Sequence, residues 1–239
     1  MPQHSKHDAT HNNGDAIANQ VFLGMPWKLV RPKYERAVDT LKKSFPLSFI
    51  IVGRDESQDA EDLLEVIKRK LMTSSYAIFD ATGGNANVSY EYGFAEAMDI
   101  PRALYLSDHQ HAKKATKESP IISDLAGKKQ NRYKQETGLH KLLRHCASDH
   151  PYTKRFEAYL KKRSRPFTAG KKKRLRTLAL KIIHQLDGDG TARRSDVVQT
   201  LLAEATGYKR EELDTEIYEM HRAGLIESIQ GRYSRLTIR

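Results

Sequence analysis

Cysteine and long apolar runs are almost absent from this chain of 239 residues. Cys146 is the single cysteine, so no intrachain disulfide can form. No apolar run approaches the roughly 18 residues that a membrane-spanning helix needs, and the opening MPQHSKHDATHNNGDA lacks the apolar core of a secretory signal. These absences predict a soluble, cytoplasmic protein with no membrane partner.

His4, His7 and His11 have a spacing found in metal sites, but they lie in the polar start of the chain, which we interpret as a disordered tail. Several histidines occur singly or in pairs without a matching set of other ligands, and we expect them at the surface or in packing roles. They are His109, His111, His140 and His184. The sequence predicts neither a metal site nor a bound cofactor.

Positive charge is concentrated in the last third of the chain. The formal net charge is +11, and the segment from Leu160 to Arg239 holds 18 Lys or Arg against 10 Asp or Glu. The rest of the chain is nearly balanced, with 23 against 20. Such a surplus makes nucleic acid a reasonable partner, and a solvated basic linker explains it equally well.

Short apolar runs rich in β-forming residues alternate with segments of helical period after residue 19. The runs are QVFLG, LSFIIVG, SYAIFD and PRALYLS, and the helical segments are 31–43, 57–73 and 87–99. Continuously apolar strands separated by helices are typical of a parallel sheet covered on both faces. We therefore predict an α/β fold with a flavodoxin-like, doubly wound parallel sheet. KKQNRY fits a polar edge strand, and TGLHKLLRHC fits a closing helix that FEAYLKK extends.

Composition divides the chain into four segments. The stretch KKRSRPFTAGKKKR carries Pro166 and Gly170 among basic residues, whose mutual repulsion favours an extended linker. The predicted segments are a disordered tail at 1–18, the α/β domain at 19–160, the basic linker at 161–174 and a small α+β domain at 175–239.

The last segment has the pattern of three helices followed by a hairpin. Ser195 fits the N-cap of the second helix, and Gln230-Gly231 fits the hairpin turn. The closing AGLIESIQGRYSRLTI resembles the end of winged helix-turn-helix domains, where the third helix leads into the wing. We predict a winged-helix-like domain here.

DNA readout by this domain is disfavoured by its charges. The helix that would enter the major groove carries Glu211, Glu212 and Asp214, which would face a polyanion at close range. A role in protein contact or dimerisation is favoured, and we expect a homo-oligomer. Phosphates could still be held without sequence preference by basic residues outside that helix. These are Lys171, Lys172, Lys173, Arg174, Arg232 and Arg235.

Polar and glycine-containing loops follow the first three predicted strands. In an open parallel sheet, ligands gather at the carboxyl ends of the strands, so these loops should open on one edge. The glycines permit close approach to a ligand, and Asn87 fits the N-cap of the next helix. The candidate binding residues are Gly24, Met25, Pro26, Asp55, Glu56, Gly83, Gly84, Asn85 and Asn87, with Asp80 at the end of its strand.

Glu91 is the most informative of these side chains. A helix starting after Asn87 places Val88, Glu91 and Tyr92 on the stripe that packs toward the sheet. Small residues on this helix, Gly93 among them, would allow close packing. A carboxylate on an inner stripe needs a partner or a function, and the plain alternative is a helix cap or an ion pair with a cation such as Arg54.

The stretch SYAIFDATGGNANVSYEYGFAEAMDIPRALYL resembles the central segment of the nucleoside 2-deoxyribosyltransferase family and of bacterial TIR-like domains. In those proteins a strand ends in Asp, and a helix beginning N-V-x-x-E-x-G-x-A carries the functional glutamate. VFLGMPW is similar to their first strand and loop, and IISDLAGKKQNRY to a later segment of TIR-like members. The resemblance covers roughly 19–147 and implies the same flavodoxin-like sheet.

By this resemblance, Glu91 would act on the ribose anomeric carbon, Asp80 would orient ribose hydroxyls, and Asn85 and Asn87 would bind the base or a hydroxyl. The ligand would be a nucleoside, nucleotide or NAD. Transferases usually offer an aspartate where this chain has Asn85, and no second acid is evident. Three readings stay open: an N-glycosidic bond enzyme, a non-catalytic nucleotide sensor, and a DNA-binding regulator whose sheet serves oligomerisation.

Overall fold

The computed structural model describes most of the chain between Ala16 and Ile238. The described residues are 16–52, 63–108, 123–186, 192–204, 207–229, 232–235 and 237–238. Most of the predicted tail, the candidates Asp55 and Glu56, and the turn Gln230-Gly231 lie outside them.

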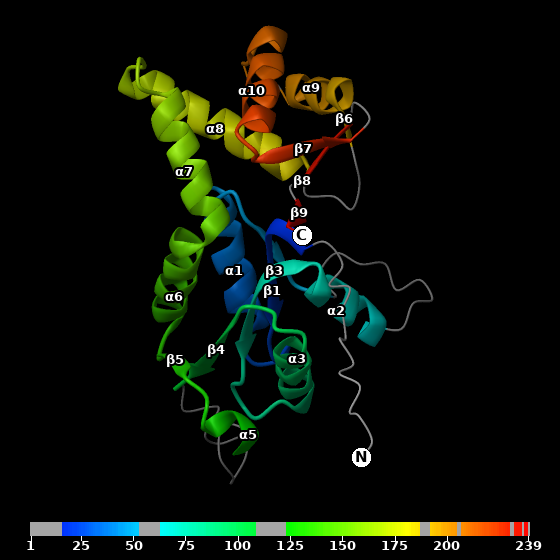
Figure 1. Ribbon diagram of the computed structural model, residues 1–239. Helices are drawn as coiled ribbons and strands as arrows, with labels where there is room; N and C mark the ends of the chain where they lie inside the picture. The colour runs from blue at the N-terminus through cyan, green and yellow to red at the C-terminus, as the bar shows by residue number, and fades with distance from the viewer. Residues whose placement is uncertain are drawn as a thin grey trace, which may run out of the picture.

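A five-stranded parallel sheet forms the centre of the first part of the chain (Figure 1). Its strands are β1 Ala16–Gly24, β2 Ser48–Ile50, β3 Ser74–Asp80, β4 Arg102–Ser107 and β5 Gln130–Tyr133. Their order is β2-β1-β3-β4-β5, with all four pairings parallel. The predicted α/β fold is confirmed, and so is the polar edge strand, because β5 pairs only with β4 among the described residues.

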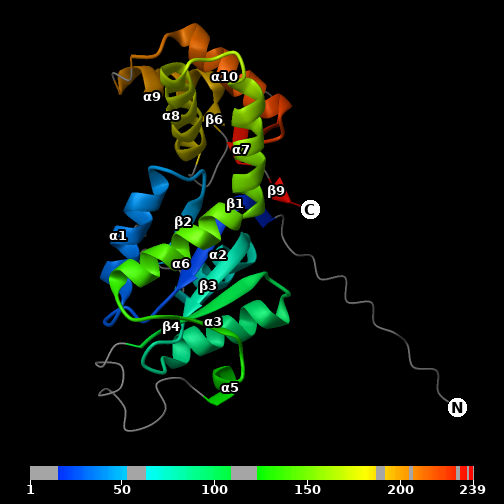
Figure 2. The same ribbon diagram turned by 90° about the vertical axis from the view of Figure 1, so that its left-hand side faces the viewer.

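Helices cover both faces of this sheet (Figures 1 and 2). On one face lie α1 Arg31–Lys42 and α6 Glu136–Asp149, and on the other lie α2 Leu63–Met72 and α3 Ala86–Ala97, with the short α5 Ser123–Ala126 beside β5. Successive strand residues face opposite sides. Phe22, Phe79 and Leu104 therefore belong to the core under α2 and α3, while Val21, Ile78 and Tyr105 belong to the core under α1.

The closing helix does not continue through FEAYLKK. Helix α6 ends at Asp149, and a separate helix, α7 Pro151–Arg163, begins directly after His150. Pro151 cannot donate a backbone hydrogen bond to α6 but suits the first position of a new helix. The His150 ring caps α7 by accepting a hydrogen bond from the backbone N–H of Tyr152 (3.2 Å).

The predicted extended conformation of 161–174 is wrong. Helix α7 continues to Arg163, and α8 Ala169–Gln185 already contains Gly170 and the four basic residues that follow it. Buried side chains on both helices, including Leu160 and Leu175, tie this basic stretch to the core. Because the charged ends point into water, their repulsion is too weak to unwind these helices.

The last part of the chain contains three helices and a three-stranded antiparallel sheet. The further elements are α9 Arg194–Ala203, α10 Arg210–Arg222, β6 Ala192–Arg193, β7 Ile226–Ile229 and β8 Arg232–Arg235. Strand order β6-β8-β7 and the Ile229–Arg232 pairing confirm the predicted hairpin. The predicted N-cap at Ser195 is wrong, since α9 starts at Arg194, two residues earlier than that cap implies, and its N-cap is Arg193. The winged-helix assignment itself stays a prediction.

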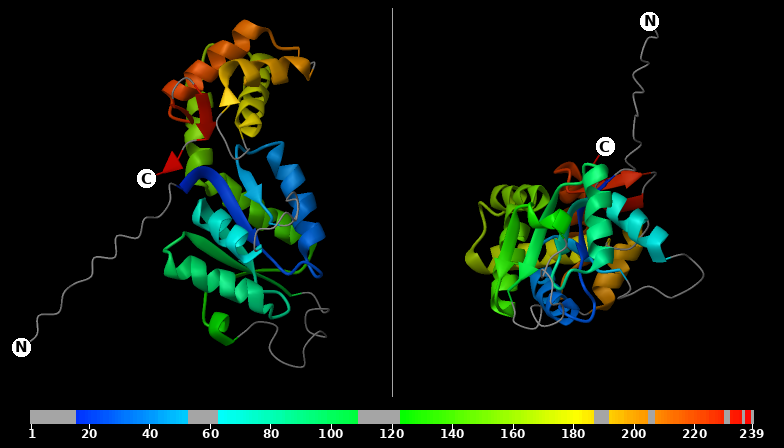
Figure 3. Two further views of the ribbon diagram at one scale, coloured as in Figure 1. Left: turned by 90° about the vertical axis from the view of Figure 1, so that its right-hand side faces the viewer. Right: turned by 90° about the horizontal axis from the view of Figure 1, so that it is seen from below.

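The two parts share one hydrophobic core. A single cluster of buried residues runs from Leu41 under the sheet to Ile183 in α8 and Ile217 in α10. The last strand, β9 Thr237–Ile238, pairs antiparallel with Ala16 and Ile17 of β1 (Figure 3). The proposed division at 160 and 175 therefore separates segments of sequence that pack together in space.

Candidate functional site

A cavity of about 610 Å³ opens at the carboxyl ends of β1 and β2, beside the first turns of α3. Its walls are mostly apolar, with few polar side chains. Of the candidates from the sequence, the cavity is lined by Gly24, Met25, Pro26, Gly83, Asn85, Asn87 and Glu91. The structure thus brings together residues from loops that are about 60 positions apart in the chain, as the parallel topology predicts.

Glu91 lies on the inner stripe of α3 with Val88, Tyr92 and Ala95. Its residue exposure is 9 %, and within the described residues its carboxylate has no hydrogen-bond or ion-pair partner. Burial raises its pKa to about 7, because the charged form loses water without gaining a compensating partner. The carboxylate is therefore held at a cavity wall in a state where small changes in its surroundings change its charge.

Gly24 makes room for this carboxylate at the end of β1. A Cβ atom built on Gly24 would lie 2.5 Å from Glu91 Oε2 and 2.7 Å from Phe79 Cδ1. No side chain fits there, so the close approach of α3 to β1 depends on glycine. Gly93 plays no such part, because it is exposed and a Cβ atom there would meet nothing within 4 Å.

The loop between β3 and α3 is shaped by two glycines with positive φ, Gly83 (76°) and Gly84 (64°). Asn85, rather than Asn87, is the N-cap of α3. Its side-chain oxygen accepts hydrogen bonds from the backbone N–H groups of Asn87 (3.0 Å) and Val88 (3.2 Å). The helix begins two residues earlier than expected, which leaves the exposed Asn87 side chain available at the cavity rim.

Asp80 does not line the cavity. It follows Phe79, whose ring packs on Tyr92 of α3, so the alternation of β3 turns Asp80 to the opposite face. There it is fully buried and accepts hydrogen bonds from Tyr34 (3.0 Å), from Tyr133 (2.6 Å) and from both the backbone N–H and the hydroxyl of Thr82. This network ties β3 to α1 and β5, which is a structural role.

The apolar rim of the cavity was not predicted from the sequence. Trp27, Leu29 and Leu63 line it and are all exposed, with Trp27 at 50 %. The Arg31 guanidinium lies 4.3 Å from the centre of the Trp27 ring and pairs with Glu35 at 2.8 Å. The signal was present in the sequence, because the chain's single tryptophan directly follows the Gly-Met-Pro loop.

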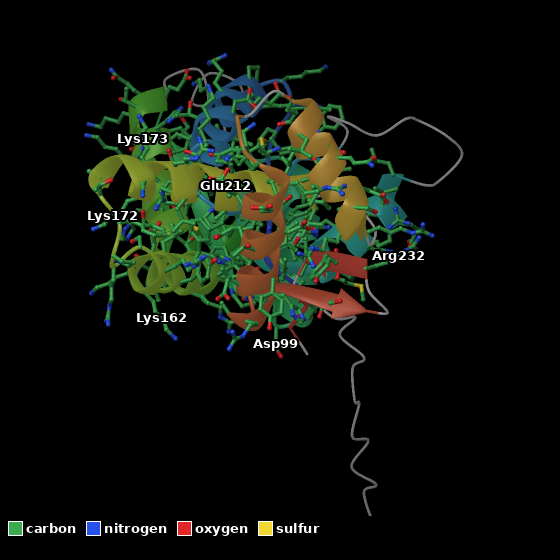
Figure 4. All side chains as sticks on the ribbon, turned by 90° about the horizontal axis from the view of Figure 1, so that it is seen from above. Asp99, Lys162, Lys172, Lys173, Glu212 and Arg232 are labelled. Carbon is green, nitrogen blue, oxygen red and sulfur yellow. The ribbon has the colours of Figure 1, made fainter. Side chains whose placement is uncertain are left out.

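The basic candidates of the last third do not form one surface. Arg235 is 6 % exposed and donates a hydrogen bond to Gln20 of β1 (3.0 Å), so its predicted contact with phosphates is wrong. Arg232 is exposed on the opposite side of the molecule from Lys172 and Lys173 (Figure 4). Arg174 is paired with Glu212 at 3.0 Å.

Neither a metal centre nor a membrane span is found in the described part of the chain. No group of three or more His, Cys, Asp or Glu side chains there could hold a metal ion. None of the helices within these ranges combines the length and the apolarity needed to cross a bilayer.

Comparison with known proteins shows a likeness among solved structures. No family model and no curated protein matches the sequence. Among solved structures, a 2-desoxiribosyltransferase from Leishmania mexicana is similar, with a TM-score of 0.40 and 13 % identity. The similarity covers 53 % of this chain and 98 % of that chain.

Proposed function

We propose that this protein cleaves the N-glycosidic bond of a nucleoside, nucleotide or NAD, by hydrolysis or transfer, with Glu91 as the reacting carboxylate. The observation that carries the proposal is an unpaired, largely buried carboxylate at the wall of an apolar cavity. A structural carboxylate in that position would be expected to have a cation or several donors around it. Glu91 has neither among the described residues.

The cavity suits the two halves of such a substrate. At its rim the exposed Trp27 ring offers a stacking surface for a base, and the apolar walls suit the faces of its ring. Asn85 uses its oxygen to cap α3, so only its amide N–H groups remain to bind a ribose hydroxyl or a base. Asn87 offers a second amide at the rim.

The chemistry follows from one negative charge near the anomeric carbon. As the C1′–N bond breaks, its electron pair leaves with the base and positive charge develops on the ribosyl group. The ionised Glu91 stabilises that charge or forms a C1′–O bond with it, and water or a second base then attacks C1′. The positive charge itself favours the ionised form, which offsets the raised pKa of Glu91.

The proposal is tested by incubating the purified protein with NAD and a panel of nucleosides and nucleotides and separating the products by chromatography. Free base or nicotinamide is expected, and Glu91→Gln should reduce its release by at least about 100-fold. Glu96→Gln is the matched control, since it makes the same change on the same helix at a side chain paired with Arg102 and Lys128. Equal release by the wild type and Glu91→Gln would contradict the proposal.

A second candidate function is nucleotide sensing without turnover. It is favoured by one observation: no other carboxylate lines the cavity within the described residues, so no side-chain acid is at hand to protonate the leaving base. This candidate predicts ligand binding without product, and affinity that Glu91→Gln hardly changes. Calorimetric titration with the same panel separates it from the enzyme.

A further inference from the structure

Six basic side chains gather where α7 ends and α8 begins, and we refer to them as the basic corner. They are Lys161, Lys162, Arg165, Lys171, Lys172 and Lys173, all exposed. Three of them, Lys162, Lys172 and Lys173, extend outward along one side of the molecule in Figure 4. None of the six side chains has an ion pair or hydrogen bond within the described residues. They are therefore available to an external polyanion.

The two helices that carry the basic corner are anchored in the core. Phe156 and Leu160 of α7 and Leu175 of α8 are buried in the shared core. The helices that carry or flank the six cations are therefore anchored, and the like charges together favour the binding of a polyanion. Helix α8 and the corner lie at one end of the molecule and α3 at the other in Figure 1, so this surface is separate from the cavity of Glu91.

A second cavity, of about 480 Å³, lies between the start of α8 and α10 and adjoins the basic corner through Lys171. Two aromatic rings, Phe167 and Tyr208, line it together with Leu175 and Leu178. The carboxylates of Glu211 and Glu212, on the first turn of α10, also line it, and the ion pair with Arg174 (3.0 Å) neutralises Glu212. The guanidinium of Arg174 lies 4.4 Å from the centre of the Tyr208 ring. Cations interleaved with aromatic rings are typical of surfaces that bind unpaired nucleotides.

Glu216 adds a buried acceptor to this cavity. It is 2 % exposed, and its Oε1 accepts a hydrogen bond from the Tyr159 hydroxyl (2.6 Å). No group of the described residues donates a hydrogen bond to its other carboxylate oxygen, and the nearby Arg163 guanidinium acts on this carboxylate only through its charge. A planar ring that carries N–H groups, such as an amino-bearing nucleobase, would satisfy that oxygen while its faces contact the apolar walls.

We infer that the basic corner and the adjoining cavity bind single-stranded nucleic acid, with phosphates on the lysines and one unpaired base in the cavity between Phe167 and Glu216. A duplex could use the lysines but could not fill the cavity. A membrane surface fits less well, because no large apolar side chain of the described residues is exposed in 161–174. The inference is independent of the function proposed for Glu91.

The first experiment measures binding of the full chain to a labelled oligonucleotide of about 20 residues, single-stranded or as a duplex, between about 50 and 200 mM salt. For the single strand, we compare the slope of the logarithm of the association constant against the logarithm of the salt concentration. K171Q/K172Q/K173Q should make this slope shallower by about 2, since each phosphate contact contributes about 0.7 to it. K129Q/K134Q/K141Q removes the same charge from exposed positions outside the basic corner and should leave the slope unchanged. Equal slopes for the two triple variants would overturn the inference.

The second experiment tests the cavity. Phe167→Ala and Glu216→Gln should each weaken single-strand binding by roughly tenfold without changing the salt slope, and duplex binding should not change. If Phe167→Ala fails to fold, Thr215→Trp takes its place in the test. The tryptophan would fill the cavity from an exposed position and should likewise weaken single-strand binding. Equal affinity for single strand and duplex, with no effect of the cavity variants, would overturn the inference. So would binding to anionic vesicles without binding to nucleic acid.

Discussion

Gly24 and Glu91 lie so close that a Cβ atom on Gly24 would stand 2.5 Å from the Glu91 carboxylate oxygen. The end of β1 and the first turns of α3 are therefore fitted to each other around a carboxylate. Any side chain at position 24 must displace either Glu91 or Phe79, whose Cδ1 would be 2.7 Å away. This contact makes the site sensitive to a single methyl group.

Gly24→Ala should therefore lower the free energy of unfolding by about 1–3 kcal/mol and abolish the activity proposed for the cavity. Gly93→Ala on α3 is the control, because a Cβ atom there meets nothing and helix propensity should raise stability by about 0.5–1 kcal/mol. Urea denaturation and product chromatography measure the two effects. A Gly24→Ala variant as active and as stable as the wild type would show that the contact is not needed.

The raised pKa of Glu91, about 7, makes stability depend on pH. A folded-state pKa above the unfolded value means that the folded protein binds this proton more tightly, so the contribution is fully present below about pH 4.5 and is lost as pH rises through 7. Glu91→Gln should consequently be more stable than the wild type by up to about 3 kcal/mol at pH 8, with the difference shrinking toward pH 5. Denaturation curves at both pH values test this, with the exposed Glu65→Gln as control.

Asp80→Ala should destabilise the fold by several kcal/mol, on the order of 3–5. The change leaves the buried hydroxyls of Tyr34 and Tyr133 and the backbone N–H of Thr82 without their acceptor. Tyr133→Phe removes one of these hydrogen bonds and should cost about 1 kcal/mol. If Asp80→Ala lost substrate affinity while its unfolding curve stayed unchanged, Asp80 would face the ligand after all.

Arg235 joins the last sheet to β1 through Gln20. Arg235→Met should lower the free energy of unfolding by about 1–3 kcal/mol, since the buried Gln20 oxygen loses a charged donor. Arg232→Met, at the exposed end of the same strand, should change it by less than about 0.5 kcal/mol. Because the core is shared, sheet and C-terminal helices should unfold in one transition; two separate transitions would contradict the single core.

Sequence patterns sufficed for the parts of the fold that depend on local periodicity. The apolar runs located four strands within a few residues, and the hairpin followed from the spacing around Gln230-Gly231. The stripe of Val88, Glu91 and Tyr92 was predicted correctly although the helix starts two residues earlier than expected. The prediction of a buried stripe stays correct when the start of the helix is misplaced, because the stripe follows from the period of 3.6 residues and not from the cap.

The positions of four strands along the chain, the edge at which the loops meet and the inner position of Glu91 were determined by the sequence alone, because hydrophobic period and loop chemistry are local properties. Only the tertiary structure decided that Asp80 faces away from Glu91, that Arg235 is buried against β1, and that the basic stretch 161–174 is largely helical. Each of these depends on which distant side chains occupy the neighbouring space, and distant contacts leave no periodic trace in a single sequence.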